Sequence, residues 1–113
     1  MIEPELRRRL EEELNAAERA RTAGEEGKAR VCARRAAGWA AADYYQRVAG
    51  PSQPNGAVEC LRWFTGRPEV PADLRQAAFR LTVHVTPDHV LPHPQDPLVD
   101  ARMIVDGLTN ARY

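Results

Sequence analysis

Arg80 and His84 are the two residues whose types and spacing could serve acid–base chemistry, and they stand four positions apart. In a helix, residues four apart lie on the same face. A histidine beside a phosphodiester can donate or accept a proton, and an arginine beside it can hold the phosphate. Arg80 and His84 are therefore candidate catalytic residues. The alternative is that His84 is a hydrogen-bonded histidine at a helix end, stabilised by the helix dipole.

Arg30, Arg34 and Arg35 fall on one arc of an Ala-rich stretch that we expect to be helical. Arginine binds phosphate and carboxylate through planar, bidentate hydrogen bonds, so this arc is a candidate anion-binding surface. The alternative is a solvated helix face, which is what most charged runs form. Asp43 falls within the apolar arc of the same stretch, where a carboxylate needs a partner. We expect that partner to be Arg47, one turn further on; a cation from another helix would instead mark a binding site.

His89 and His93 lie in a proline-rich segment, 87–97, whose four prolines exclude a helix. Their spacing would suit a metal ion on a helix but not across the intervening proline, so we expect no metal site. Cys32 and Cys60 are the only cysteines, and neither belongs to a CxxC pair. Isolated cysteines of this kind indicate free thiols and a cytoplasmic location. No cofactor is expected.

The charges of the chain balance, since 16 basic and 16 acidic residues give a formal net charge of zero. This balance excludes the strongly basic footprint of many nucleic-acid-binding domains, although it leaves room for a local patch. The 113 residues suit a single domain with one core, so we expect one helical-bundle domain spanning 1–113. No apolar run has the length of a signal peptide or a membrane span, which predicts a soluble protein with no membrane partner.

Apolar periodicity predicts helices over residues 3–23, 25–48, 71–85 and 97–111, with an extra short helix at 57–65. The first and last of these begin with a proline, and Asp96 is placed to cap the last one. Short connections make neighbouring helices antiparallel. The expected fold is therefore all-α: an antiparallel four-helix bundle with a long proline-rich loop before the last helix. A homodimer that covers part of the Ala-rich helix is an open alternative.

Several side chains are expected on particular helix faces. Phe79 should broaden the buried face of the helix at 71–85, and Asp100 should face solvent. Glu13 projects towards an apolar stripe and needs a partner if it is buried. Trp63 and Phe64 should cap the core rather than stack on nucleic-acid bases, because no basic, glycine-rich strand surrounds them.

The pattern resembles the HEPN superfamily of small prokaryotic four-helix bundles, which are linked to nucleotide and RNA biology. The likeness covers nearly the whole chain and rests on ARVCARRAAGWAAADYYQRV, on LRQAAFRLTVHV followed by TPDHVLPHP, and on DPLVDARMIVDGLTNA. Catalytic members carry an arginine, four to six residues and then a histidine. Between Arg80 and His84 there are three residues, and Leu81 stands where the family usually has a polar residue. The pair of Arg80 and His84 is thus a degenerate form of the family's catalytic motif. The complete motif implies a metal-independent ribonuclease.

Three functions follow from these observations. The first is a non-catalytic HEPN-like bundle that binds a nucleotide, RNA or a partner protein. Its binding residues would be Arg30, Arg34, Arg35 and Asp43. The second is a homodimeric structural or interaction module without a nucleic-acid role, with an interface near Trp39 and Tyr45; the resemblance also implies a nucleotidyltransferase-type partner protein. The third is a ribonuclease that uses Arg80 and His84, with Asp43 or Glu13 orienting them.

Overall fold

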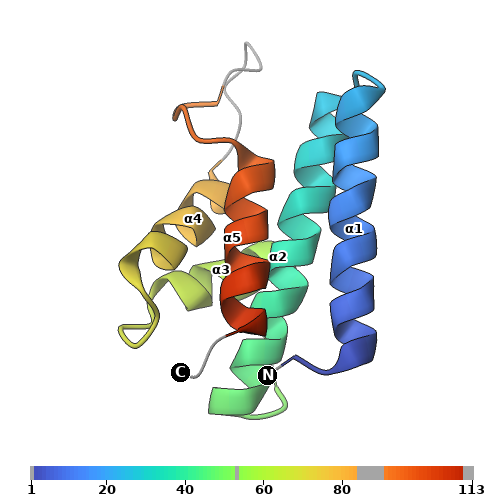
Figure 1. The fold of residues 1–113 in the computed structure, drawn as a ribbon. Coiled ribbons are helices and arrows are strands. Elements are labelled where there is room, and N and C mark those ends of the chain that lie inside the picture. Colours follow the sequence, from blue (N-terminus) through green and yellow to red (C-terminus); the bar gives the residue numbers. More distant parts are fainter. Residues whose placement is uncertain (1, 53, 84–90, 111–113) are drawn as a thin grey trace.

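The computed structural model describes residues 2–52, 54–83 and 91–110 (Figure 1). Within these ranges the chain forms five α-helices and no strand, which confirms the all-α fold. The helices are α1 (Pro4–Thr22), α2 (Glu26–Ala49), α3 (Ala57–Thr65), α4 (Ala72–Thr82) and α5 (Pro97–Thr109). In the described part of the chain, no helix combines the length and the apolar character that crossing a membrane requires.

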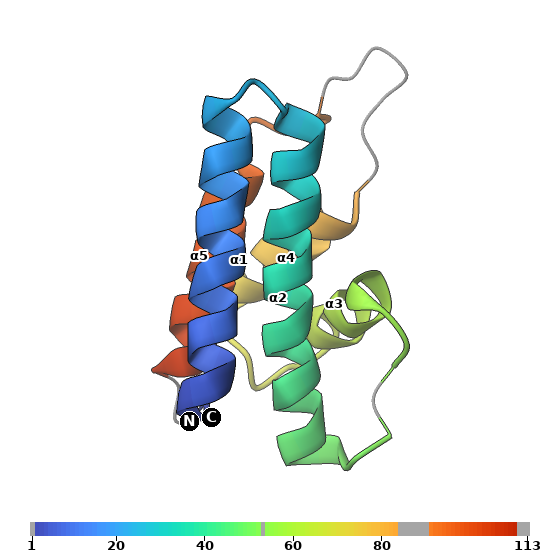
Figure 2. The ribbon, with the colours of Figure 1, turned by 90° about the vertical axis from the view of Figure 1, so that its right-hand side faces the viewer.

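Helix α2 is the central element and contacts all four other helices. Helix α1 runs antiparallel beside it, and α5 packs against both α1 and α2 (Figure 1). Helices α3 and α4 pack on each other on another side of α2, and α4 also contacts α5 (Figure 2). The other helices therefore surround α2, as expected for the Ala-rich stretch.

Small side chains on α2 allow its neighbours to approach closely. The residues that α2 buries are Ala29, Cys32, Ala33, Ala36, Ala37, Gly38, Ala40, Ala41 and Tyr44. The closest approach is at Gly38, where an added Cβ would lie 2.4 Å from the Cβ and 2.7 Å from the Cα of Ala57. Any larger residue at Gly38 would push the start of α3 away from α2. Both cysteines are buried free thiols, as expected.

Local capping explains where the helices begin and end. The side chain of Glu3 accepts a hydrogen bond from the amide of Leu6 at 3.0 Å and caps α1. Gly24, at a φ of 80°, takes the left-handed conformation that the tight turn into α2 requires. The expected cap at Asp96 is confirmed, since its carboxylate accepts from the amide of Leu98 at 2.9 Å.

Three expectations about α4 and α5 are wrong. Helix α4 does not continue to residue 85, because it ends at Thr82 and Val83 has an extended backbone. Phe79 is 58% exposed, because the face that α4 buries is made by other residues of the helix. Asp100 is only 1% exposed, because it forms an ion pair with Arg80 in the interior instead of facing solvent.

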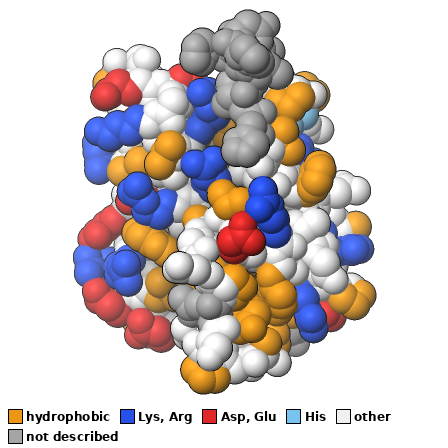
Figure 3. Space-filling model, turned by 180° about the vertical axis from the view of Figure 1, so that it is seen from behind, with side chains coloured by type: hydrophobic (Ala, Val, Ile, Leu, Met, Phe, Trp, Pro, Cys, Tyr) orange, Lys and Arg blue, Asp and Glu red, His pale blue; other side chains and the backbone are white. Residues whose placement is uncertain are grey.

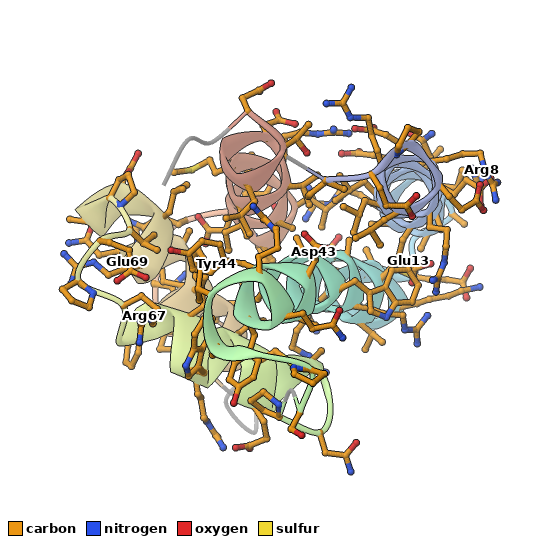
Figure 4. The ribbon with its side chains drawn as sticks, turned by 90° about the horizontal axis from the view of Figure 1, so that it is seen from below. Arg8, Glu13, Asp43, Tyr44, Arg67 and Glu69 are labelled. Carbon is orange, nitrogen blue, oxygen red and sulfur yellow. The ribbon has the colours of Figure 1, made fainter. Side chains whose placement is uncertain are left out.

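The outer face of α1 carries the ion pairs that its alternating charges predict. Arg8 pairs with both Glu5 and Glu12. Figure 4 shows Arg8 pointing away from the other helices. Seen from behind, the edge formed by α1 has acidic and basic side chains next to one another (Figure 3). Exposed pairs of this kind contribute little to stability, so this face is a solvated surface.

An aromatic cluster of Tyr44, Tyr45, Trp63 and Phe64 joins the C-terminal half of α2 to α3. Tyr44 is fully buried, and its ring centroid lies 5.8 Å from that of Trp63 and 5.7 Å from that of Phe64. The ring centroid of Tyr45 lies 4.7 Å from that of Trp63. Phe64 is buried and Trp63 is packed against the core, which confirms that the two residues cap it.

Candidate anion-binding site

A cavity of about 350 Å³ lies between the N-terminal half of α2, the end of α4 and the segment that leads into α5. This volume falls in the range of small-ligand sites. We call it the arginine cavity. The polar side chains that line it are Arg30 and Arg34 from α2, Arg80 from α4, His93 from the segment before α5, and Asp100 from α5.

Arg80 is held in place by Asp100. Its Nε donates to Oδ2 of Asp100 at 2.9 Å, and its Nη2 donates to Oδ1 at 2.8 Å. The two side chains are 18% and 2% exposed. These hydrogen bonds and the charge of Asp100 raise the pKa of Arg80 above its ordinary value. Arg80 thus presents a fixed guanidinium whose charge is already balanced.

Arg30 and Arg34 differ from the other arginines of the described chain. Each is half-buried, yet neither has a hydrogen bond or an ion pair within the described ranges. Arg7, Arg9 and Arg19 also form no ion pair with described residues, but their side chains are exposed. A guanidinium on the wall of a cavity that has no carboxylate beside it can gain a charge-assisted hydrogen bond to an anion. The arginine cavity is thus lined by two positive charges that have no ion-pair partner among the described residues.

Arg21 joins three helix ends close to the cavity, since its partners Glu26 and Asp96 directly precede the lining residues Gly27 and Pro97. It donates to Glu26, at the start of α2, at 3.0 and 2.7 Å, and to Asp96, before α5, at 2.7 and 2.9 Å. These bonds lower the pKa of both carboxyl groups, and the nearby charge of Arg30 lowers that of Glu26 further. The same carboxylates raise the pKa of Arg21. The arginine cavity consequently has a well-anchored wall.

His93 lines the cavity from the segment before α5, where it stands between two prolines of the chain. Both of its ring nitrogens are shut off from water and have no hydrogen-bond partner among the residues that the structure describes. Sequence reasoning considered His93 only as a metal ligand and missed its place beside the arginines. The flanking prolines were the one signal, because they hold a side chain in a fixed position.

The structure brings together four of the arginines and histidines singled out in the sequence: Arg30, Arg34, Arg80 and His93. The catalytic pairing of Arg80 with His84 lies outside the described residues, because His84 falls in the range 84–90, as does His89. The reading of Arg80 as a catalytic residue therefore stays a prediction. What the structure adds is that its guanidinium is engaged by Asp100.

Arg35 and Asp43 do not line the arginine cavity. Arg35 donates to Glu13 at 2.7 Å, so Glu13, whose side chain is 15% exposed, has the partner that it needs. Asp43 accepts from Nε of Arg47 at 2.9 Å, as expected. Figure 4 shows that Asp43 lies on a different side of α2 from Tyr44. Both carboxylates therefore have structural partners within the chain.

A second hollow of about 590 Å³ adjoins the arginine cavity along α2. The two share Val31 and Arg34, and the second hollow continues to Trp39 and to the start of α3. The guanidinium of Arg9 lies 4.7 Å from the ring centroid of Trp39 and covers one face of the indole. A ligand larger than a single anion can therefore extend from Arg34 towards Trp39.

The arrangement suits the binding of an anion. Arg30 and Arg34, which form no hydrogen bond or ion pair with the described residues, lie on one face of α2, and Arg80 from α4, held by Asp100, lines the same cavity. Within residues 2–52, 54–83 and 91–110, no three side chains of histidine, cysteine, aspartate or glutamate come together as metal ligands would. Comparisons with protein-family models, with curated proteins and with solved structures gave no match. The HEPN resemblance therefore stays a prediction.

Proposed function

We propose that the protein binds a phosphate-bearing ligand, a nucleotide or an RNA, in the arginine cavity and does not cleave it. The observation that supports this most strongly is the pair of half-buried arginines, Arg30 and Arg34, which have no carboxylate partner among the described residues. Most other arginines of the described chain are engaged by a carboxylate.

The spacing of Arg30 and Arg34 suits a phosphate. Residues four apart on a helix are neighbours on one face, with a rise of about 6 Å between them. Two guanidinium groups at that separation can hold the oxygens of one phosphate from two sides. Hydrogen bonds between charged partners are about twice as strong as neutral ones. Because Arg80 is already neutralised by Asp100, its role is to shape the wall and donate, rather than to attract the ligand from a distance.

The second hollow favours a nucleotide over an isolated phosphate. It begins at Arg34, where the phosphate would sit, and continues towards Trp39. A sugar and base attached to the phosphate would have room there. This ligand class agrees with what the HEPN resemblance implies. As part of the proposal, we keep a HEPN-like arrangement in which α1, α2, α4 and α5 are the four bundle helices.

Binding of AMP and of a short single-stranded RNA, at low and at physiological salt, tests the proposal. Arg30→Gln and Arg34→Gln should each weaken binding about tenfold, which corresponds to the loss of about 1.4 kcal/mol. Arg19→Gln is the matched control, because it removes the same charge from an exposed, unpaired arginine outside the cavity. Its affinity should stay within about twofold of the wild type, since Arg19 makes no contact with the ligand.

Two results would contradict the proposal. One is an equal loss of affinity in Arg19→Gln and in the cavity variants, which would mean unspecific attraction to positive charge. The other is the absence of binding by the wild-type protein at low salt. The cavity variants should unfold at nearly the wild-type denaturant concentration, because the replaced side chains have no described partner to lose.

A further inference from the structure

His93 is the exception in an otherwise well-satisfied interior. Among the described residues, its two ring nitrogens are the only buried side-chain nitrogen or oxygen atoms without a hydrogen-bond partner. Nearly all buried polar groups in folded proteins have a partner, because leaving one unpaired costs free energy. An unpaired buried imidazole on the wall of a cavity therefore indicates a group that a ligand completes.

The backbone around His93 keeps the ring at this wall. Proline stands on each side of it, at Pro92 and Pro94, and restricts the rotation of the chain. Two residues further on, Asp96 is bound to Arg21 and caps α5. The segment is thus fixed at its end. Because both ring nitrogens are shut off from solvent, the ring must turn about its own side-chain bonds to present one of them to a ligand in the cavity.

The charges that face His93 come from three helices. Arg30 and Arg34 approach from α2, Arg80 from α4 and Asp100 from α5, and the last two balance each other. The ring therefore stands among a net excess of positive charge. A bound anion reverses the sign of this environment and favours the protonated imidazole, which donates from both nitrogens.

We propose that His93 is a further ligand-binding residue of the arginine cavity, beside its arginines, and that the cavity takes up one proton at His93 when it binds an oxyanion. This inference rests on the proposed function, since it concerns the same site. By linkage, a ligand that takes up a proton binds more tightly as the pH falls. An imidazole changes its charge between about pH 5 and 8, so the affinity should vary over that range.

Inorganic sulfate is the probe that isolates this effect. A phosphate monoester loses a charge of its own near pH 6, which would obscure the titration of the protein, whereas sulfate keeps its charge over the whole range. Sulfate affinity of the wild-type protein should rise about tenfold from about pH 8 to about pH 5.5. In His93→Gln the affinity should be nearly independent of pH. In Arg30→Gln the sulfate affinity should be lower at both pH values, but it should change with pH as it does in the wild type.

The outcomes separate this inference from the proposed function. If neither sulfate nor AMP binds the wild-type protein at either pH, the proposed function fails and this inference with it. If both bind, and His93→Gln keeps the pH dependence of the wild type, the cavity binds anions without a proton at His93. The proposed function then stands and the present inference is overturned.

A direct readout avoids dependence on the folding of one variant. The ring-nitrogen signals of the three histidines of the wild-type protein can be followed by NMR during a sulfate titration at fixed pH. The signals of His93, assigned with His93→Gln or His93→Asn, should move towards those of a doubly protonated ring as sulfate binds. Signals that stay unchanged while sulfate binds would contradict the inference.

Discussion

Two groups of polar side chains on α2, one in each half of the helix, differ in whether they find partners within the described chain. Near its C-terminal end, the hydroxyl of the buried Tyr44 donates to Glu69 at 2.8 Å, and Nε of Arg67 donates to the same carboxylate at 2.9 Å. Figure 4 shows the three side chains gathered beside the aromatic cluster. Near its N-terminal end, Arg30 and Arg34 face a cavity without a described partner.

This difference separates a structural site from a candidate binding site. Where each polar group finds a partner within the chain, a ligand has nothing to gain, and the site stabilises the fold. Where half-buried charges lack one, the chain gives up stability that a ligand can restore. If the comparison is correct, changes at the C-terminal half should alter stability alone, and changes at the arginine cavity should alter binding.

The largest effect is expected from Tyr44→Ala. It removes a fully buried ring together with its contacts to Trp63 and Phe64, so the free energy of unfolding should fall by about 3–5 kcal/mol. Urea denaturation measures this. Under conditions where the variant is folded, its AMP affinity should equal that of the wild type. Reduced affinity of the folded variant would mean that the two halves of α2 are not independent.

A smaller loss is expected from Asp100→Asn, at the boundary between the two kinds of site. It leaves the guanidinium of Arg80 without its counter-charge, so the free energy of unfolding should fall by about 2–3 kcal/mol. AMP should then stabilise this variant more than it stabilises the wild type, because Arg80 becomes a third unpaired cation. Asp106→Asn is the control, since Asp106 is exposed on the same helix. If AMP raises the melting temperature of Asp100→Asn and that of the wild type by the same amount, Arg80 lies outside the binding surface.

The smallest loss of stability is expected at alkaline pH, where the hydroxyl of Tyr44 loses its proton. Burial, and then the hydrogen bond to Glu69, raise the pKa of Tyr44 to about 12 from an ordinary value near 10. A raised pKa means that the folded state holds the proton more tightly than the unfolded state does. The stabilisation is thus complete below about pH 10 and is lost as the pH rises towards 12.

Tyr44→Phe tests this pH dependence. The phenylalanine keeps the ring but has no proton to lose, so the stability of the variant should fall less steeply above about pH 10 than that of the wild type. The difference should reach about 2 kcal/mol at about pH 11.5. Urea denaturation at a series of pH values gives both slopes. If the stability of both proteins changes equally with pH, the hydroxyl of Tyr44 titrates in the same way in the folded and the unfolded state.

Local signals in the sequence predicted the helices well. The short helix at 57–65 has the expected bounds, because Gly56 and Gly66 stand on either side of it. The pair of Asp43 and Arg47 was also predictable, since residues four apart on a helix meet. Such features depend only on neighbours in the chain, and the sequence contains all the information that they need.

Features that depend on packing between helices could not be predicted. Asp100 was expected on the surface because its place in the helical pattern is polar, but its burial is decided by Arg80, 20 positions earlier. The convergence of Arg34 with His93 has no sequence spacing that could indicate it, since it depends on how α2 and the segment before α5 meet in space. The arginines were recognisable as a group, whereas their division into paired and unpaired members was not.

The contact between Gly38 and Ala57 bears on how distant relatives of this chain could be recognised. The two positions are 19 apart in the sequence, the first in the middle of one helix and the second at the start of the next. Because no larger side chain fits between them, a protein that keeps this crossing must keep two small residues at this separation. Surface charges, and the lengths of the loops outside residues 38–57, can diverge around that pair. A chain that has a larger residue at the position of Gly38 must therefore separate the two helices at this point.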